Sequence, residues 1–151
     1  MRPLTATISS AALASIREEI AATPPHLETG GILLGMPDSW SITVAGRAGP
    51  GAVRTPTFFL RDLEFTQQLA AKEAEGSGAQ WLGEWHTHPT GPPRPSRTDL
   101  HTYATLQDQL AGAFSSGLLS LIITPIGESF GITAWSCTSA SATQLHIEEE
   151  S

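Results

Sequence analysis

The sequence predicts an α+β fold, in which helices flank a mixed, mostly antiparallel β-sheet within one domain. The length of 151 residues fits a single domain and suffices for a sizeable core. Three segments place apolar residues at helical spacing, and short apolar runs bounded by glycine or proline lie between them. The alternation of helices and strands, with several strands at the end of the chain, is typical of α+β domains.

The first half of the chain is expected to contain one helix and a strand hairpin. Residues 9–22, SSAALASIREEIAA, have helical apolar spacing between a serine cap and two prolines. GGILLG at 30–35 fits a buried strand, and the alternating segment 39–46 fits its hairpin partner. The stretch 47–55, rich in glycine and proline, is expected to be an exposed loop before a short strand around 57–60.

The second half is expected to contain two further helices and four strands. A helix is expected from Asp62 to about Glu75, and a strand over 80–88 leads into a proline-rich loop. A third helix is expected from near Ser96 to about Leu110. The last strands are expected over 118–124, 130–136 and 143–147, before an acidic tail at 148–151.

Composition and charge exclude several functional classes. The net charge is −7, and the eight Lys and Arg residues are scattered, which argues against a nucleic-acid partner. No apolar run approaches the roughly eighteen residues of a membrane span, and no signal peptide is evident, so a cytoplasmic protein without membrane contact is expected. The lone Cys137 cannot form an intramolecular disulfide and rules out zinc sites built on cysteine pairs.

Residues 84–99, EWHTHPTGPPRPSRTD, have a pattern typical of a metal site. Side chains alternate between the two faces of a strand, so His86 and His88 are expected to project from the same face. Pro89 ends the strand, and the following loop returns the chain so that Asp99 lies at the start of a helix. Two histidines and one carboxylate are a ligand set of hydrolytic zinc sites, and imidazole favours zinc over magnesium.

These residues also have simpler interpretations. Histidines near strand ends are commonly surface residues, and Ser96-x-x-Asp99 has the form of a helix capping box with aspartate in place of glutamate. Both interpretations of Ser96 are compatible, because its hydroxyl can cap the helix when no substrate is bound. Glu84 has four open roles: partner of a histidine, fourth ligand, general base or exposed strand residue. Its proximity to His86 alone would favour the general base.

The pattern H-T-H-P-x6-S-x-x-D at 86–99 resembles the signature of the JAMM metalloproteases, the catalytic branch of the MPN (JAB1/Mov34/PAD-1) superfamily. This family also has an upstream glutamate, and ETGGILLG at 28–35 is similar to its E-x-G-G-x-L-x-G form. The resemblance extends over about residues 8–147. It implies a JAB/MPN-type domain over 1–151 that is related to the cytidine deaminase-like fold.

The sequence differs from the typical family pattern in two respects. The family usually has serine between the two histidines, where this chain has Thr87. The loops around 47–60 and after Asp99 are short, so the chain resembles the compact prokaryotic JAB proteins. Some of those are encoded beside ubiquitin-like, E1-like and E2-like genes in bacterial antiphage systems.

The resemblance implies a zinc-dependent isopeptidase or peptidase that cleaves after the C-terminal tail of a ubiquitin-like protein. Glu28 rather than Glu84 would then be the general base, and a glutamate can take a proton from water and hand it to the leaving amine. Ser96 would donate a hydrogen bond to the oxyanion. The implied partners are a ubiquitin-like protein or its conjugates and E1-like or E2-like proteins. The implied ligands of about one zinc ion per chain are His86, His88 and Asp99.

Three alternatives remain at this stage. The first is a sulfur-carrier processing peptidase of the same fold, with identical chemistry and a different substrate. The second is a non-catalytic MPN scaffold, although such members lack ligands that this chain has. The third is a cytidine deaminase-like zinc protein. It needs H-x-E and P-C-x-x-C motifs, and the single cysteine of this chain excludes it. The residues expected to be structural or on the surface are His26, His101, His146, Cys137, Trp81, Trp85 and Trp135.

Overall fold

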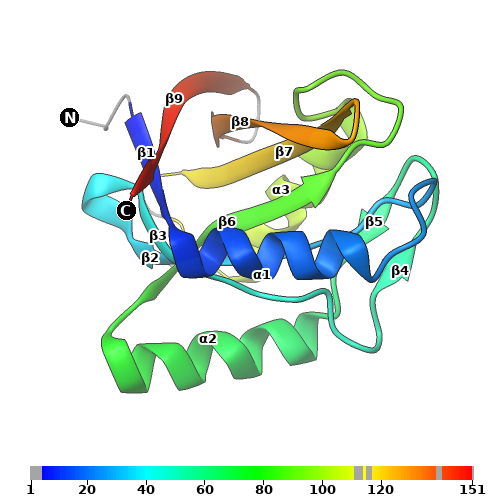
Figure 1. Ribbon diagram of the computed structural model, residues 1–151. Helices are drawn as coiled ribbons and strands as arrows, with labels where there is room; N and C mark the ends of the chain where they lie inside the picture. Colours follow the sequence, from blue (N-terminus) through cyan, green and yellow to red (C-terminus); the bar gives the residue numbers. More distant parts are fainter. Residues whose placement is uncertain (1–4, 111–113, 115–116, 139–140, 151) are drawn as a thin grey trace.

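A closed β-barrel with helices packed around it forms the core of the computed structural model (Figure 1). The structure describes residues 5–110, 114, 117–138 and 141–150. The helices are α1 (Ser10–Ala21), α2 (Leu63–Ser77) and α3 (Arg97–Gln109), with a 3-10 turn, η1, at Pro37–Ser39. The strands are β1 (Thr5–Ser9), β2 (Gly30–Met36), β3 (Ser41–Ala45), β4 (Val53–Arg54), β5 (Phe59–Leu60), β6 (Gln80–Thr87), β7 (Leu118–Ile126), β8 (Ser129–Cys137) and β9 (Ala142–Glu150).

The barrel confirms a mixed sheet in which antiparallel pairs predominate. The strand order is β1-β3-β2-β6-β7-β8-β9, and β9 returns to pair with β1. β2 pairs antiparallel with β3 and β6, as does β8 with β7 and β9. The pairs β1–β3, β1–β9 and β6–β7 are parallel. The expectation of a mixed α+β arrangement is therefore confirmed. The closure of the sheet into a barrel was not predicted from the sequence.

Closure depends on one segment for which the sequence predicted no element and on a second for which the prediction was wrong. Residues 5–9 form β1, whose alternate side chains Ala6 and Ile8 are buried. Residues 148–150, expected to be an acidic tail, continue β9 and pair with β1. Backbone hydrogen bonding holds this edge while the glutamate side chains stay exposed, so local hydrophobicity could not reveal it.

The expected loop 47–55 is also corrected in part. Its last residues form β4, which pairs with β5 in a two-stranded ribbon outside the barrel. Val53 and Leu60, opposite each other in this ribbon, are 46% and 40% exposed. The ribbon lies beside the start of β2, because the backbone NH of Glu28 donates to the carbonyl of Thr55 at 2.8 Å.

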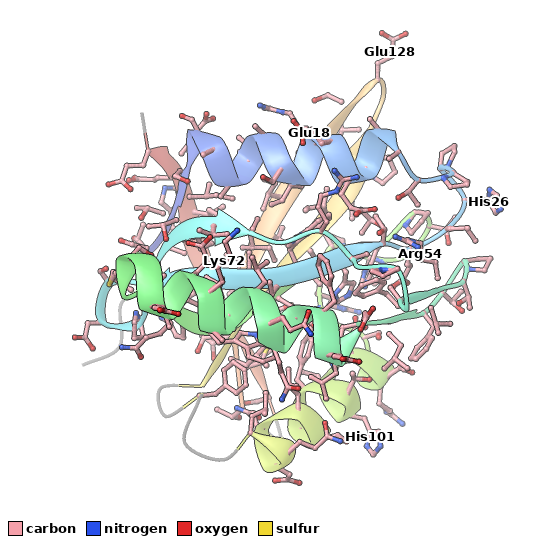
Figure 2. The ribbon with its side chains drawn as sticks, turned by 90° about the horizontal axis from the view of Figure 1, so that it is seen from below. Glu18, His26, Arg54, Lys72, His101 and Glu128 are labelled. Atoms are coloured by element: carbon pink, nitrogen blue, oxygen red, sulfur yellow. The ribbon has the colours of Figure 1, made fainter. Side chains whose placement is uncertain are left out.

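The helices cover different faces of the barrel. Figure 2 shows α1 and α3 on opposite sides of β2, with α2 in front. α1 begins after the N-cap Ser9 and buries Leu13 and Ile16 in the main core, where Trp85 is also fully buried. α3 packs through Tyr103 in a second cluster, in which Trp81 and Trp135 are partly buried. The expectation that these tryptophans are core residues is confirmed. In the described part of the chain, every helix is too short or too polar to cross a bilayer.

Candidate metal centre

The register of two neighbouring strands places the candidate residues at one end of the barrel. β2 and β6 are antiparallel, with Gly30 opposite His86 and Gly31 opposite Trp85. The start of β2, and Glu28 just before it, therefore lie beside the end of β6, where His86 and His88 are found. Alternation along β6 turns Trp85 into the main core and His86 toward α3, as the spacing predicts.

The structure brings together four residues that the sequence singled out. One potential ligand atom from each of Glu28, His86, His88 and Asp99 lies within 4.8 Å of the others. The Nε2 atoms of His86 and His88 are 3.0 Å apart, and they lie 3.1 and 3.0 Å from Oδ2 of Asp99. Both imidazoles are buried, with side-chain exposures of 2% and 4%. Such a group could hold a metal ion, because its donors converge on one point.

Asp99 is positioned by the start of α3. Ser96 is the N-cap of this helix, and its Oγ accepts a hydrogen bond from the backbone NH of Asp99 at 3.0 Å. The backbone NH of Ser96 donates in return to Oδ2 of Asp99 at 2.7 Å. The capping-box interpretation is therefore confirmed. Burial raises the pKa of Asp99, but hydrogen bonds from His86 and His88 outweigh it, so the net pKa is lowered and the carboxylate stays ionised.

The capping box leaves the hydroxyl proton of Ser96 available. Its Oγ uses a lone pair for the helix cap, and the described residues offer no acceptor for its O–H. Ser96 can therefore cap α3 and donate a hydrogen bond to another group at the same time.

Glu28 is buried at the edge of this group, and its carboxyl group lacks hydrogen-bond partners among the described residues. Its side chain is 4% exposed, and Oε1 has no hydrogen-bond partner among the described residues. Burial raises its pKa to about 7, although the neighbouring His86 and His88 act in the opposite direction. A surface role is therefore excluded, and an unpaired oxygen in a group of buried donors fits a site that takes a cation and a water molecule.

The two glycines after Glu28 serve strand packing. A Cβ on Gly30 would lie 2.2 Å from the carbonyl oxygen of Trp85, and one on Gly31 would lie 2.0 Å from that of Gly46. The Gly-Gly pair therefore lets the backbone of β2 lie close to β6 at Gly30 and close to the residue after β3 at Gly31.

Thr87, the residue between the two histidines in the sequence, also links β6 to the segment before β2 by hydrogen bonds. The backbone NH of Thr29 donates to Oγ1 of Thr87 at 3.0 Å, and the NH of Thr87 donates to the carbonyl of Thr29 at 2.9 Å. Thr87 points away from the metal group, so its substitution for the family's serine leaves the ligand face unchanged.

Glu84 is outside the group and has a different role. Its carboxylate accepts two hydrogen bonds from Arg61, from Nε and Nη2, each 2.6 Å long. The two side chains are 3% and 7% exposed, so this is a buried ion pair. The roles of fourth ligand and exposed residue are wrong, and an oxygen pair occupied by a guanidinium is poorly placed to act as a base. Arg61 could not be predicted as its partner, because no local signal links it to a carboxylate 23 positions away.

Two hydroxyl side chains that were not predicted as part of the site lie near His86. Oη of Tyr103 lies 3.3 Å from Nδ1 of His86 and 2.7 Å from Oγ of Ser120, and all three side chains are buried. The available signal was position, since Tyr103 follows Asp99 by one turn of α3. His88 has a different partner, the carbonyl oxygen of Pro92, 2.8 Å from its Nδ1.

The remaining histidines lie away from the centre. Figure 2 shows His26 beyond the end of α1 and His101 on the outer side of α3, and both are exposed. His146 is exposed on β9, where it lies 3.3 Å from Glu148. Cys137 is buried beside Tyr103 in the second cluster, which supports a structural role.

The fold and the clustered histidine and carboxylate groups define a barrel domain with a candidate metal centre, and comparisons identify its family. The model of the prokaryotic homologues of the JAB domain matches residues 9–138, so the chain belongs to this family. The fold is similar to the solution structure of protein DSY2949 from Desulfitobacterium hafniense, with a TM-score of 0.71 and 22% identity over 95% of this chain and 92% of that one. No curated protein matches the chain.

Proposed function

We propose that this chain is a zinc-dependent peptidase or isopeptidase that cleaves after the C-terminal tail of a ubiquitin-like protein. The observation that carries the proposal is the convergence of Glu28, His86, His88 and Asp99 within 4.8 Å in a JAB-family chain. Two imidazoles and a carboxylate suit zinc better than magnesium. A non-catalytic scaffold is disfavoured, because it would not need to keep these buried groups together. A kinship with the cytidine deaminase-like fold forms part of the same proposal.

The residues of the centre would have three different roles in the reaction: metal binding, proton transfer and oxyanion stabilisation. Bound zinc, held by His86, His88 and Asp99, would supply Lewis-acid activation of a water molecule and the scissile carbonyl. Glu28 would take the proton from the water and deliver it to the leaving amine, a role that suits a buried carboxylate whose Oε1 has no partner among the described residues. Ser96 would donate a hydrogen bond from its free hydroxyl to the developing oxyanion.

Features around the centre support an extended, small-ended substrate. The centre is buried, so a tail ending in glycine would enter it more readily than a chain with bulky side chains. Among the described residues β4 and β5 pair as strands only with each other, so each has one edge without a strand partner, and the ribbon lies near Glu28, whose NH donates to Thr55. An extended peptide could add to such an edge by backbone hydrogen bonding, and the exposed Val53 and Leu60 would contact its side chains.

The biological setting proposed is conjugation or precursor processing of a ubiquitin-like protein. The partners would be that protein or its conjugates, together with E1-like or E2-like proteins, in a bacterial antiphage system. A sulfur-carrier processing peptidase is the alternative, since its substrate has the same kind of tail.

A cleavage assay with paired substrates tests the proposal. Zinc-loaded protein is incubated with a ubiquitin-like protein fused through its Gly-Gly tail to a reporter, and in parallel with a sulfur-carrier protein fused in the same way. We expect cleavage after the tail, abolished in Glu28→Gln with zinc retained and reduced roughly 10²–10³-fold in Ser96→Ala. Glu18→Gln, at a glutamate that is 71% exposed, is the matched control and should cleave normally. Cleavage of the sulfur-carrier fusion alone would favour the alternative, and cleavage of neither would refute the proposed substrate class.

A further inference from the structure

The single tyrosine of the chain lies between a candidate metal ligand and a buried serine. Tyr103 is 1% exposed, and α3 carries it one turn after Asp99, on the same face of the helix. Its hydroxyl is 2.7 Å from Oγ of Ser120 on β7 and 3.3 Å from Nδ1 of His86 on β6. Ser120 lies directly opposite Glu84 in the β6–β7 register, on the face that α3 covers. The hydroxyl therefore sits where three elements meet.

The state of Nδ1 decides whether His86 can bind a metal through Nε2. A neutral imidazole carries one N–H, and a metal takes the nitrogen without it. The Nε2 atoms of both histidines face Asp99, so metal binding there requires the proton of each ring to lie on Nδ1. That N–H is buried and needs an acceptor.

The two histidines meet this requirement in different ways. Nδ1 of His88 faces the carbonyl of Pro92, which can only accept, so its tautomer is fixed by the backbone. Nδ1 of His86 faces the Tyr103 hydroxyl, which can either donate or accept. The direction of the Tyr103–Ser120 hydrogen bond therefore decides which tautomer His86 adopts. The 2.7 Å contact allows either hydroxyl to donate, and donation from Tyr103 to Ser120 leaves Oη free to accept from His86.

We propose that Tyr103, oriented by Ser120, is a positioning residue that holds the proton of His86 on Nδ1 and so strengthens metal binding at Nε2. This inference rests on the proposed function, because it concerns the same centre. Without metal, the hydrogen bonds can run in the opposite direction: Ser120 donates to Tyr103, Tyr103 donates to Nδ1, and Nε2–H donates to Asp99. With a metal bound, Nε2 would lose its proton to solvent and Nδ1 would gain one from solvent. Both hydroxyls would rotate, so that Nδ1–H donates to Tyr103 and Tyr103 donates to Ser120. The ring and the two hydroxyls keep the same total number of protons, and the only new bond is that between Nε2 and the metal.

Zinc affinity, measured by competition with a chromogenic chelator, tests the proposal without any substrate. Tyr103→Phe removes only the hydroxyl and should weaken zinc binding about 10–100-fold, the usual effect of losing such a hydrogen bond. Ser120→Ala should weaken it less. Ser136→Ala is the matched control, because the Oγ of this buried serine has no hydrogen-bond partner in the part of the chain that the structure describes, and its zinc affinity should equal that of the wild type.

A second readout follows from the single tyrosine. Protein labelled with ¹³C at tyrosine Cζ gives one resonance from this residue, which should shift on zinc saturation as the hydroxyl changes from donor toward His86 to acceptor. The shift should be smaller in Ser120→Ala, a variant that keeps the ring and its packing. An unchanged resonance would overturn the reversal.

The outcomes separate this inference from the proposed function. If the wild type binds no zinc, the proposed function fails. If the wild type binds zinc and Tyr103→Phe binds it equally well, the positioning role is wrong and the proposed function stands. A Tyr103→Phe variant that loses folding stability but keeps zinc affinity would also overturn the role, since tyrosine would then only fill the core.

Discussion

Removing one member of the buried Arg61–Glu84 pair should destabilise the protein strongly without removing its metal. In Glu84→Gln, the Arg61 guanidinium, 7% exposed, would keep at most one of its two 2.6 Å hydrogen bonds and remain buried without its counter-charge. Breaking a buried pair in this way typically costs about 3–5 kcal/mol. For a domain of this size, each kcal/mol lowers Tm by roughly 2–4 °C, so a fall on the order of 10 °C is expected.

Replacing both members provides the diagnostic comparison. The double substitution Arg61→Met/Glu84→Met removes the charges together and should recover most of the lost stability, because no uncompensated charge remains. The assay is urea unfolding and thermal melting of metal-free protein, with zinc content measured on the same samples. A loss below about 1 kcal/mol in Glu84→Gln would refute the buried-pair reasoning. Full stability with abolished cleavage would make Glu84 the general base.

Two further predictions concern β2 and the carboxyl that precedes it. Gly31→Ala should cost about 1–3 kcal/mol in urea unfolding, because its Cβ would lie 2.0 Å from the carbonyl oxygen of Gly46. In Gly76→Ala, within α2, the Cβ meets nothing within 4 Å, and a gain of about 0.5–1 kcal/mol is expected instead. The pKa of Glu28 is raised from 4.5 to about 7, so the folded metal-free protein binds this proton more tightly than the unfolded chain does, and its stability should fall as pH rises from 4.5 to 7. Urea midpoints across this range should fall less in Glu28→Gln, and an identical pH profile would contradict the assignment of the shift to Glu28.

The parts of the fold that could be predicted are those with a strong local pattern. The three helices and the buried strands β2, β6 and β7 have clear apolar periodicity and clear ends, and the sequence located each within a few residues. Closure of the barrel could not be predicted, because β1 is short and the end of β9 reads EEE. The two strands are stabilised by pairing with each other, and the paired residues are about 140 positions apart in the sequence.

The candidate site was predictable where it depends on spacing along one strand and one helix. The alternation of His86 and His88 and the capping position of Asp99 are local, and the structure brings all three to one point. The role of Glu84 could not be predicted, because its partner Arg61 lies in the segment before α2, and only the folded structure brings the two together. The contact between Tyr103 and Ser120 was beyond prediction for the same reason, since it needs the packing of α3 on β7.

Elemental analysis tests the central claim most directly, because every proposed role depends on a metal held by the two histidines and Asp99. Protein purified without added chelator should contain about one zinc ion per chain. The His86→Ala/His88→Ala double variant should contain none while it remains folded by circular dichroism. Wild-type protein without zinc that cannot be loaded with it, or a double variant that retains a full equivalent, would contradict the account.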